Sequence, residues 1–404
     1  MRYILGLFFL FNVSFSATEI INNVSYNIKT KFKTEDENLD ISQFQELIEK
    51  NLKLVNRINV NREYLRNEYL LTCTVSRHTD YAVDCELENF FVSDTTWKKQ
   101  FTGTDLVKIS GNIAKNVVKE VREINVDFNA KLGFIEYKKA NKFNSCFIVS
   151  DIHGINRETY FCENAYIFRP VLNQKDKHIY YNTLDEKGKL KLKRFSLTTR
   201  RLSDFKILGF QNKKVLSIAF SNEYDSVAFT TMPEDNDNAP LFIVRDEKII
   251  KVEKRYINST PIFLNNNTLI YATNSKGKPR LVKNEFSKFF GFGYATNLVS
   301  KSFPTGMFEP AMHANSKLIT FTTVEDANFS LIMYDMQDED LKFIDSGFMI
   351  ERSDWSADGF FIAYGFQELK NTNSVIKIYP YHGLGHFKFT TISSANNLSY
   401  PIFL

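Results

Sequence analysis

The chain has 404 residues, of which 43% are hydrophobic and 15% aromatic, so it can bury a large core. Its 51 Lys and Arg nearly balance 47 Asp and Glu, which argues against a nucleic-acid-binding protein. The 38 Phe and 19 Tyr favour strands over helices, and the length fits a small domain followed by a large β-domain.

The first residues predict export from the cytoplasm. Arg2 gives a positive start, the segment Tyr3–Val13 is apolar, and small residues precede Ala17. The apolar run is too short to span a bilayer, so we expect residues 1–16 to be a cleaved signal peptide. A retained membrane anchor is the alternative.

A small α/β domain is expected next, over residues 35–130. Residues 17–34 predict a flexible start that runs into a strand. Apolar residues at three- and four-residue spacing predict a helix over Asp40–Leu54, with Asp40 or Ser42 as its cap, and a second helix over Asp105–Ile124. The segment between the helices contains a hairpin.

Four cysteines form two pairs, and each pair is symmetric about a polar turn. Cys73 and Cys85 flank one turn, and Cys146 and Cys162 flank another. Residues equidistant from a hairpin turn face each other within reach of a disulfide. We therefore expect the disulfides Cys73–Cys85 and Cys146–Cys162; the alternative is two buried pairs of free thiols. The spacing does not match a metal site, because no CxxC occurs.

From residue 131 onward a module recurs that consists of a short inner segment, a polar turn and a strongly apolar strand. This period of 43 to 49 residues, with several short strands per unit, is typical of propeller blades. The equivalent positions are Pro170, Ile218, Pro261, Pro310, Ser353 and Pro401.

The two ends of this region complete each other. Tyr400–Leu404 repeats the inner segment without a second strand, and Gly133–Tyr137 repeats the second strand without an inner one. Joined, they make a sixth blade that leaves no open edge at the seam. The sequence therefore predicts a mainly β protein: a six-bladed β-propeller over residues 131–404, closed by its C-terminal strand and preceded by the small α/β domain.

Several motifs resemble the TolB family. Trp355–Tyr364 resembles the "WSPDGxxIAY" element of TolB-type propellers, and Ser150–Asn156 resembles their "SDxDGxN" turn. Tyr400–Phe403 is similar to the closing "PAW" strand, and Trp97–Gly133 resembles the junction of the two TolB domains. The sequence departs from the family in its other inner turns, which are eroded, and in residues 17–34, which lack the typical "VVPF" strand.

The resemblance implies a periplasmic, monomeric protein-binding hub of the Tol-Pal system, associated with the outer membrane through its partners. In the family, the mature N-terminus binds TolA; here it comprises Ala17, Thr18, Glu19, Ile20 and Ile21. One mouth of the propeller receives Pal, the peptidoglycan-associated lipoprotein. The corresponding loop residues before the inner strands are Asn258, Ser259, Thr260, Phe308, Glu309, Ile350, Glu351, Arg352, Ser399 and Tyr400, with Phe308 as the expected aromatic anchor.

No catalytic constellation is evident, since there is no G-x-S-x-G elbow, and we expect neither an enzyme nor a bound cofactor. His382 and His386 are four residues apart but lie in a glycine-containing turn, so no metal site is expected. A weakly held cation in the channel stays open. The alternative function is a periplasmic propeller that binds or degrades a carbohydrate or another small ligand.

Overall fold

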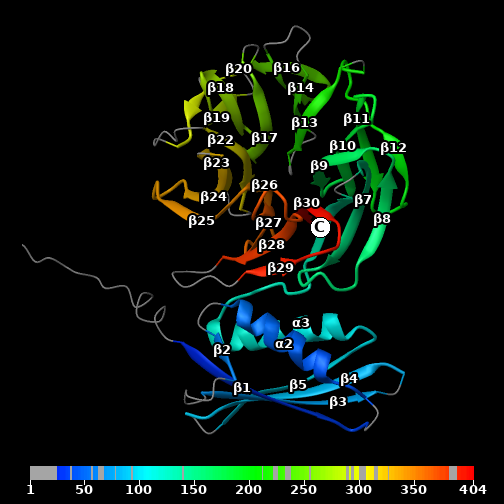
Figure 1. Ribbon diagram of the computed structural model, residues 1–404. Helices are drawn as coiled ribbons and strands as arrows, with labels where there is room; N and C mark the ends of the chain where they lie inside the picture. Colours follow the sequence, from blue (N-terminus) through cyan, green and yellow to red (C-terminus); the bar gives the residue numbers. More distant parts are fainter. Residues whose placement is uncertain are drawn as a thin grey trace, which may run out of the picture. The chain divides into compact units, whose positions relative to one another are not determined.

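The computed structural model (Figure 1) describes two compact units, one up to Ile124 and one from Asn125 onward. The expected signal peptide, the TolA-binding residues Ala17, Thr18, Glu19, Ile20 and Ile21, and both His382 and His386 lie outside the described residues. No described helix is long and apolar enough to cross a membrane. The described residues are 25–36, 39–55, 58–61, 68–77, 79–91, 94–138, 141–211, 213–221, 226–232, 238–253, 256–287, 291–292, 295–299, 306–313, 317–325, 327–381 and 389–404.

The first unit is a five-stranded sheet in the order β2-β1-β3-β4-β5. Strand β1 runs parallel to β2 and β3, and the remaining pairs are antiparallel. The strands are β1 (Tyr26–Thr34), β2 (Ile58–Val60), β3 (Tyr69–Arg77), β4 (Tyr81–Asn89) and β5 (Asp94–Gly103).

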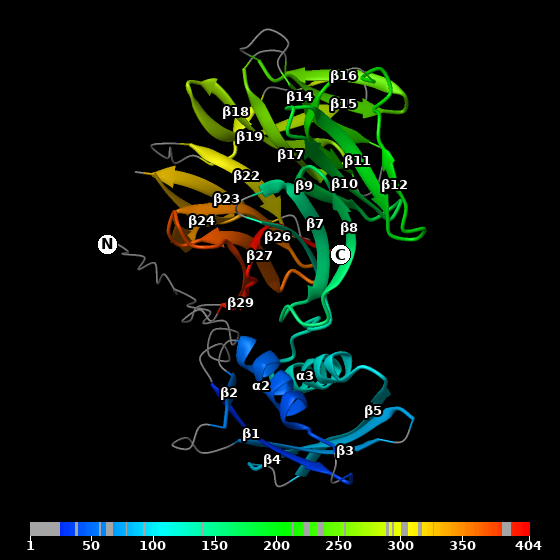
Figure 2. The same ribbon diagram turned by 45° about the vertical axis from the view of Figure 1, so that its right-hand side comes forward.

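Two helices, α2 (Ser42–Leu54) and α3 (Leu106–Arg122), cover one face of this sheet (Figures 1 and 2). The predicted helices are confirmed. The side chain of Asp105 caps α3 by accepting from the N–H of Val107 at 2.9 Å. The α2 prediction needs a correction: its N-cap is Ile41, without a side-chain bond, because the Asp40 carboxylate accepts from the Ser42 N–H in a turn before the helix.

Both predicted disulfides are confirmed. Cys73 in β3 faces Cys85 in β4, with Cα atoms 4.2 Å apart. Cys146 faces Cys162 across another antiparallel pair, with Cα atoms 4.0 Å apart. Each bridge therefore links neighbouring strands of a single sheet.

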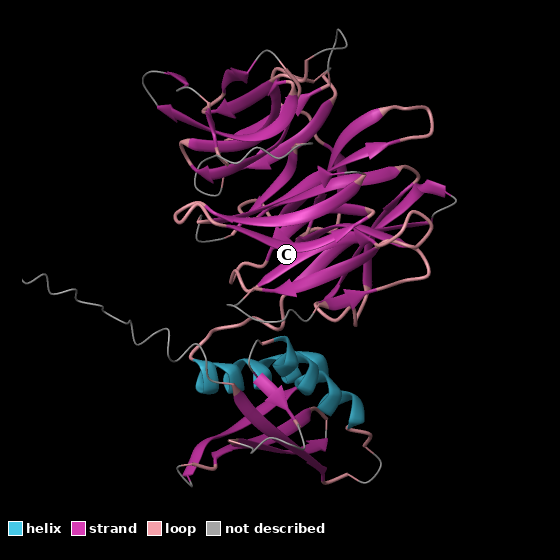
Figure 3. Cartoon of the chain, turned by 60° about the vertical axis from the view of Figure 1, so that its left-hand side comes forward, coloured by secondary structure: helices cyan, strands magenta, loops and turns pink. Residues whose placement is uncertain are grey.

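The second unit is a six-bladed propeller, whose sheets form a ring in Figure 1. Figure 3 shows this unit built from strands and loops, with the helices confined to the first unit. Blades two to six, from inner to outer strand, are β9 (Tyr166–Asn173), β10 (His178–Leu184), β11 (Leu190–Ser196) and β12 (Leu202–Asp204); β13 (Val215–Phe220), β14 (Val227–Thr231), β15 (Leu241–Arg245) and β16 (Lys248–Glu253); β17 (Asn258–Asn265), β18 (Thr268–Lys276) and β19 (Lys278–Ser287) with β20 (Gly291–Phe292) and β21 (Thr296–Asn297); β22 (Met307–Met312), β23 (Leu318–Glu325), β24 (Asn328–Asp335) and β25 (Leu341–Gly347); and β26 (Met349–Trp355), β27 (Phe361–Gln367), β28 (Val375–Pro380) and β29 (Thr390–Ile392).

The first blade joins the two ends of the propeller sequence, as predicted. Its inner strand is β30 (Asn397–Phe403), followed outward by β6 (Lys131–Lys138), β7 (Asn141–Asp151) and β8 (Glu158–Glu163). Strand β30 pairs antiparallel with β6, and Ile402 lies opposite Gly133. Side chains of the closing strand are buried, with Ile402 2% and Phe403 7% exposed. The C-terminal strand is therefore part of the core.

The six inner strands line the central channel and all run in one direction. We call the face at which they begin the start face and the face at which they finish the end face. The connection from each outer strand to the next inner strand leads to the start face, and the polar turn after each inner strand lies on the end face.

Candidate functional site

In five of the six blades the pairing between the inner and the second strand is irregular. The irregularity lies at or next to the equivalent positions of the repeat, Pro170, Pro261, Pro310, Ser353 and Pro401. At four of these the residue before proline has a left-handed backbone, with φ of 50° at Arg169, 46° at Thr260, 49° at Glu309 and 48° at Tyr400. A positive φ is uncommon for residues other than glycine, and bulges often redirect a side chain. The repeat therefore places one residue from each of these four blades at equivalent positions of the inner strands.

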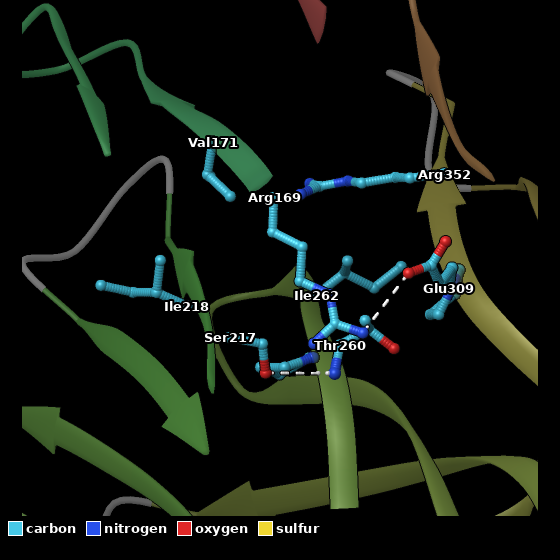
Figure 4. Close-up of a pocket in the computed structure, with 10 residues that line it drawn as sticks. Arg169, Val171, Ser217, Ile218, Thr260, Ile262, Glu309 and Arg352 are labelled. Carbon is cyan, nitrogen blue, oxygen red and sulfur yellow. Dashed lines mark hydrogen bonds and ion pairs between the residues drawn. The ribbon is translucent and has the colours of Figure 1, made fainter. Parts of the chain in front are cut away.

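An ion pair crosses the channel at this level. Arg169 from β9 and Glu309 from β22 approach to 3.4 Å between Nη2 and Oε1, with side chains 25% and 18% exposed. Figure 4 shows the two side chains pointing toward each other, with Arg352 extending from β26 beside them. The cavity beside the pair measures only about 10 Å³, about the space of one water molecule. We call this narrow level of the channel, lined by Arg169, Glu309 and Arg352, the waist. It lies between the two mouths of the channel.

Hydrogen bonds fix the backbone around the waist. The N–H of Thr260 donates to Ser217 Oγ at 3.2 Å, which ties β17 to the neighbouring inner strand β13. The hydroxyls of Ser217 and Thr230 bond to each other at 2.6 Å. Arg352 Nη1 donates to the carbonyl of Pro170 at 3.1 Å and bridges β26 to β9. The channel wall is thus held by contacts between blades.

Acidic groups in the wall are strongly affected by burial. Burial first, and then the charge of Glu309, raise the pKa of Glu351 to about 8. Burial raises the pKa of Asp354 to about 6, while the attraction of Arg352 opposes the rise. Burial also raises the pKa of Tyr400. Glu351 is therefore largely protonated at neutral pH.

The structure corrects the placement of the ten residues predicted for the Pal-binding face. All lie within inner strands and not in the loops before them, because the strands begin earlier than the sequence pattern indicated. They are Asn258, Ser259 and Thr260 in β17, Phe308 and Glu309 in β22, Ile350, Glu351 and Arg352 in β26, and Ser399 and Tyr400 in β30.

These ten residues also differ in their exposure to solvent and in their position along the channel. Asn258, Ile350 and Ser399 are buried, at 1%, 2% and 0% exposure. Glu309 and Arg352 line the waist. Phe308 is half-buried and pairs with Thr322 of the next strand. At least six of the ten residues are therefore buried or line the waist cavity, and do not form an exposed surface.

Sequence reasoning missed Arg169 in this wall. The signal was present, because Arg169 precedes Pro170 as Thr260, Glu309 and Tyr400 precede their prolines. It also missed three exposed apolar residues on the start face: Met232 after β14, Ile257 before β17 and Leu369 after β27, which are 45%, 50% and 63% exposed. These stand in outer-to-inner connections or after second strands, where no periodicity marks them.

Within the described ranges, no group of three or more His, Cys, Asp or Glu side chains is arranged to hold a metal ion. The channel groups provide charge, hydrogen-bond donors and apolar surface, which suit binding.

No protein-family model and no curated protein matches the sequence. The solved structures do give matches. TolB from Acinetobacter baumannii superposes with a TM-score of 0.78 at 14% identity, over 94% of this chain and 96% of that one. The chain has the fold of TolB.

Other solved structures are less similar. A nidogen/laminin complex matches with a TM-score of 0.50 at 10% identity, over 68% of this chain and 98% of that one. An oligogalacturonate lyase in complex with manganese has a TM-score of 0.40 at 8% identity, over 58% of this chain and 68% of that one. The TolB match includes both units, since it spans 94% of this chain.

Proposed function

We propose that this protein is a non-catalytic, periplasmic binding hub of the Tol-Pal type. Its start face binds a Pal-type lipoprotein, and its mature N-terminus, Ala17 to Ile21, binds a TolA-type partner. The pair of contacts links the outer membrane and cell wall to an energised inner-membrane protein, which maintains outer-membrane integrity and supports constriction during division.

The observation that carries the proposal is the position of the exposed apolar side chains. Among the described residues of the propeller, the large apolar side chains that are most exposed are on the start face or on the outer flank. Met232, Ile257 and Leu369 are on the start face. Those on outer strands, at the flank, are Leu202, Ile249 and Phe343, and Leu208 lies in the connection from β12 to β13. Apolar anchors on a rigid, preformed surface are what a protein interface uses.

The narrow waist favours a partner protein that binds at the start face and does not enter the channel. The Arg169–Glu309 pair occupies the centre of the channel, so a folded partner can rest on the start face without passing through. The loops of this face converge from six blades onto one surface, which is the usual setting of a propeller's binding site. The two disulfides and the TolB fold support a periplasmic location, because disulfides persist in oxidising compartments.

The experiment is a binding assay of the mature protein with the Pal-type and TolA-type proteins of the same organism. We expect saturable binding of both, and we expect deletion of residues 17–21 to abolish TolA binding while Pal binding stays within twofold. A glycan panel serves as the competing arm. Saturable glycan binding without binding of either protein would replace this proposal with the carbohydrate-binding alternative.

A further inference from the structure

A second cavity opens at the end face, on the other side of the waist. It measures about 190 Å³ and spans three consecutive blades, with the closing strand β30 in the middle. This is far more than the ~10–15 Å³ that one water molecule needs, and it is below the ~300–1,000 Å³ typical of drug-sized ligands. The lining residues that matter here are Leu172, Arg352, Asp354, Trp355, Ile402 and Phe403.

Arg352 brings unused donors to this cavity. Its guanidinium has five N–H groups. Over the described ranges it makes one hydrogen bond, to the carbonyl of Pro170, and no ion pair within 4.0 Å. None of its other nitrogen atoms is sealed from solvent. Burial also lowers the pKa of Arg352, because the charged form has less water around it than in solution. A carboxylate entering the cavity would replace that missing solvation with a charge-assisted bond.

Asp354 brings the opposite charge. It stands two residues after Arg352 on β26, so both side chains project to the same side of the strand. Its Oδ2 accepts from the Phe403 N–H at 2.7 Å, which fixes the carboxylate against β30. Asp354 lines the cavity, so its carboxylate can accept a bond from a ligand there. A ligand ammonium can bond there.

Apart from Gln174, the other side chains that line the cavity are apolar. Leu172 lies on one side of the cavity, and Ile402 lies on β30. The indole of Trp355 packs against His313 and Tyr381 and donates to Thr320 Oγ1 at 3.1 Å, which fixes the end of β26 beside the cavity. A cavity of this size with one cation, one anion and an apolar wall matches a small zwitterion that also has an apolar group.

We propose that this end-face cavity binds a free α-amino acid with an apolar side chain. The ligand carboxylate bonds to Arg352, its ammonium bonds to Asp354, and its side chain packs against Leu172 and Ile402. This site is separate from the start face, so it neither requires nor competes with the protein partners proposed above.

The test is calorimetric titration of the mature wild-type protein with L-leucine. Two analogues remove one charge each: leucinamide lacks the carboxylate, and 4-methylpentanoate lacks the ammonium. We expect one saturable leucine site and at least tenfold weaker binding of both analogues. The absence of leucine binding up to about 10 mM, which corresponds to a binding free energy weaker than about 3 kcal/mol, would overturn the proposal. So would equal binding of leucine and leucinamide.

Variants locate the site. Asp354→Asn keeps an oxygen that can accept from Phe403 N–H but removes the charge, and we expect at least tenfold weaker leucine binding. Asp340→Asn makes the same substitution at an exposed position in the turn before β25 and is expected to leave the affinity unchanged. Equal affinities of the two variants would overturn the assignment. The analogue series needs only the wild-type chain, so it decides the matter if Asp354→Asn does not fold.

Discussion

At the scale of residues, a buried tyrosine hydroxyl is tied to an ion pair in the sixth blade. Tyr364 on β27 is fully buried and donates to Asp345 Oδ2 at 2.8 Å. The same oxygen accepts from Lys377 Nζ on β28 at 2.7 Å. Lys377 also lies over the ring of Phe366. The acid comes from the outer strand of the preceding blade, so the cluster joins two blades.

The second blade repeats this arrangement. Tyr181 donates to Glu163 Oε1 at 2.9 Å, and Lys193 bonds to the same carboxylate at 2.8 Å. Tyr181 pairs with Lys193, as Tyr364 pairs with Lys377. Glu163 comes from the outer strand of the first blade. Two of the interfaces between blades are thus held by the same combination of tyrosine, acid and lysine.

We expect Tyr364→Phe and Tyr181→Phe to destabilise the protein by similar amounts, about 1–3 kcal/mol each, because each removes a hydrogen bond to a charged group without leaving a cavity. Urea unfolding of the two variants and the wild type measures this. A loss below about 0.3 kcal/mol in both variants would show that the clusters add nothing to the free energy of unfolding.

Glu351 gives a prediction for the pH dependence of stability. Its pKa in the folded protein, about 8, lies above the ordinary 4.5, so the folded state holds a proton that the unfolded chain has lost between these values. Stability therefore falls as the pH rises through this window. Asp354 acts in the same direction, but only up to its pKa of about 6.

We expect Glu351→Gln to remove the loss of stability between pH 6 and 8 and to raise the free energy of unfolding at pH 8 by about 1–3 kcal/mol. Below pH 6 the variant should keep the slope that Asp354 contributes. Denaturant unfolding at a series of pH values provides the measurement. Parallel curves for variant and wild type between pH 6 and 8 would contradict the assignment.

At the scale of elements, the closing strand β30 is the element on which the ring depends. It supplies the inner strand of the first blade, and its N–H and C=O groups pair with β6. Ile402 and Phe403 are buried, and burying each such side chain is worth about 1.5–3 kcal/mol.

Deletion of residues 399–404 is therefore expected to unfold or aggregate the protein. The deletion removes most of an inner strand and exposes the edge of β6. Ile402→Ala offers a milder change with an expected cost of about 2–5 kcal/mol. Thermal melting of both variants measures the effect, and a truncated protein that melts like the wild type would be incompatible with this closure.

Periodic elements could be predicted from the sequence, and the aperiodic ones could not. The helices α2 and α3 show a clear apolar stripe, and the inner strands recur at a regular interval, so both were predicted. Strand β2 has only three residues, and β5 has widely spaced apolar residues, Trp97 and Phe101, so neither was. The bulges at Arg169 and its equivalents depend on backbone geometry, which the apolar pattern does not show. For this reason the ten residues that the sequence placed in loops before the inner strands lie within those strands.

At the scale of the whole propeller, the two mouths of one channel differ in chemistry. The start face carries exposed Met232, Ile257 and Leu369, which suit a protein partner. The end face has a small cavity that contains Arg352 and Asp354, which suits a small charged ligand. The Arg169–Glu309 pair lies between them. One rigid ring can therefore offer two separate binding sites.

The most direct test of the account is the affinity of a Pal-type lipoprotein for two matched variants. Ile257→Asp places a charge on the start face, and Ile249→Asp makes the same change on outer strand β16, at similar exposure of 50% and 46%. We predict at least tenfold weaker binding, about 1.4 kcal/mol, for Ile257→Asp and unchanged binding for Ile249→Asp, with similar melting temperatures. Weaker binding of Ile249→Asp alone, or equal affinities of both variants, would contradict the start face as the partner surface.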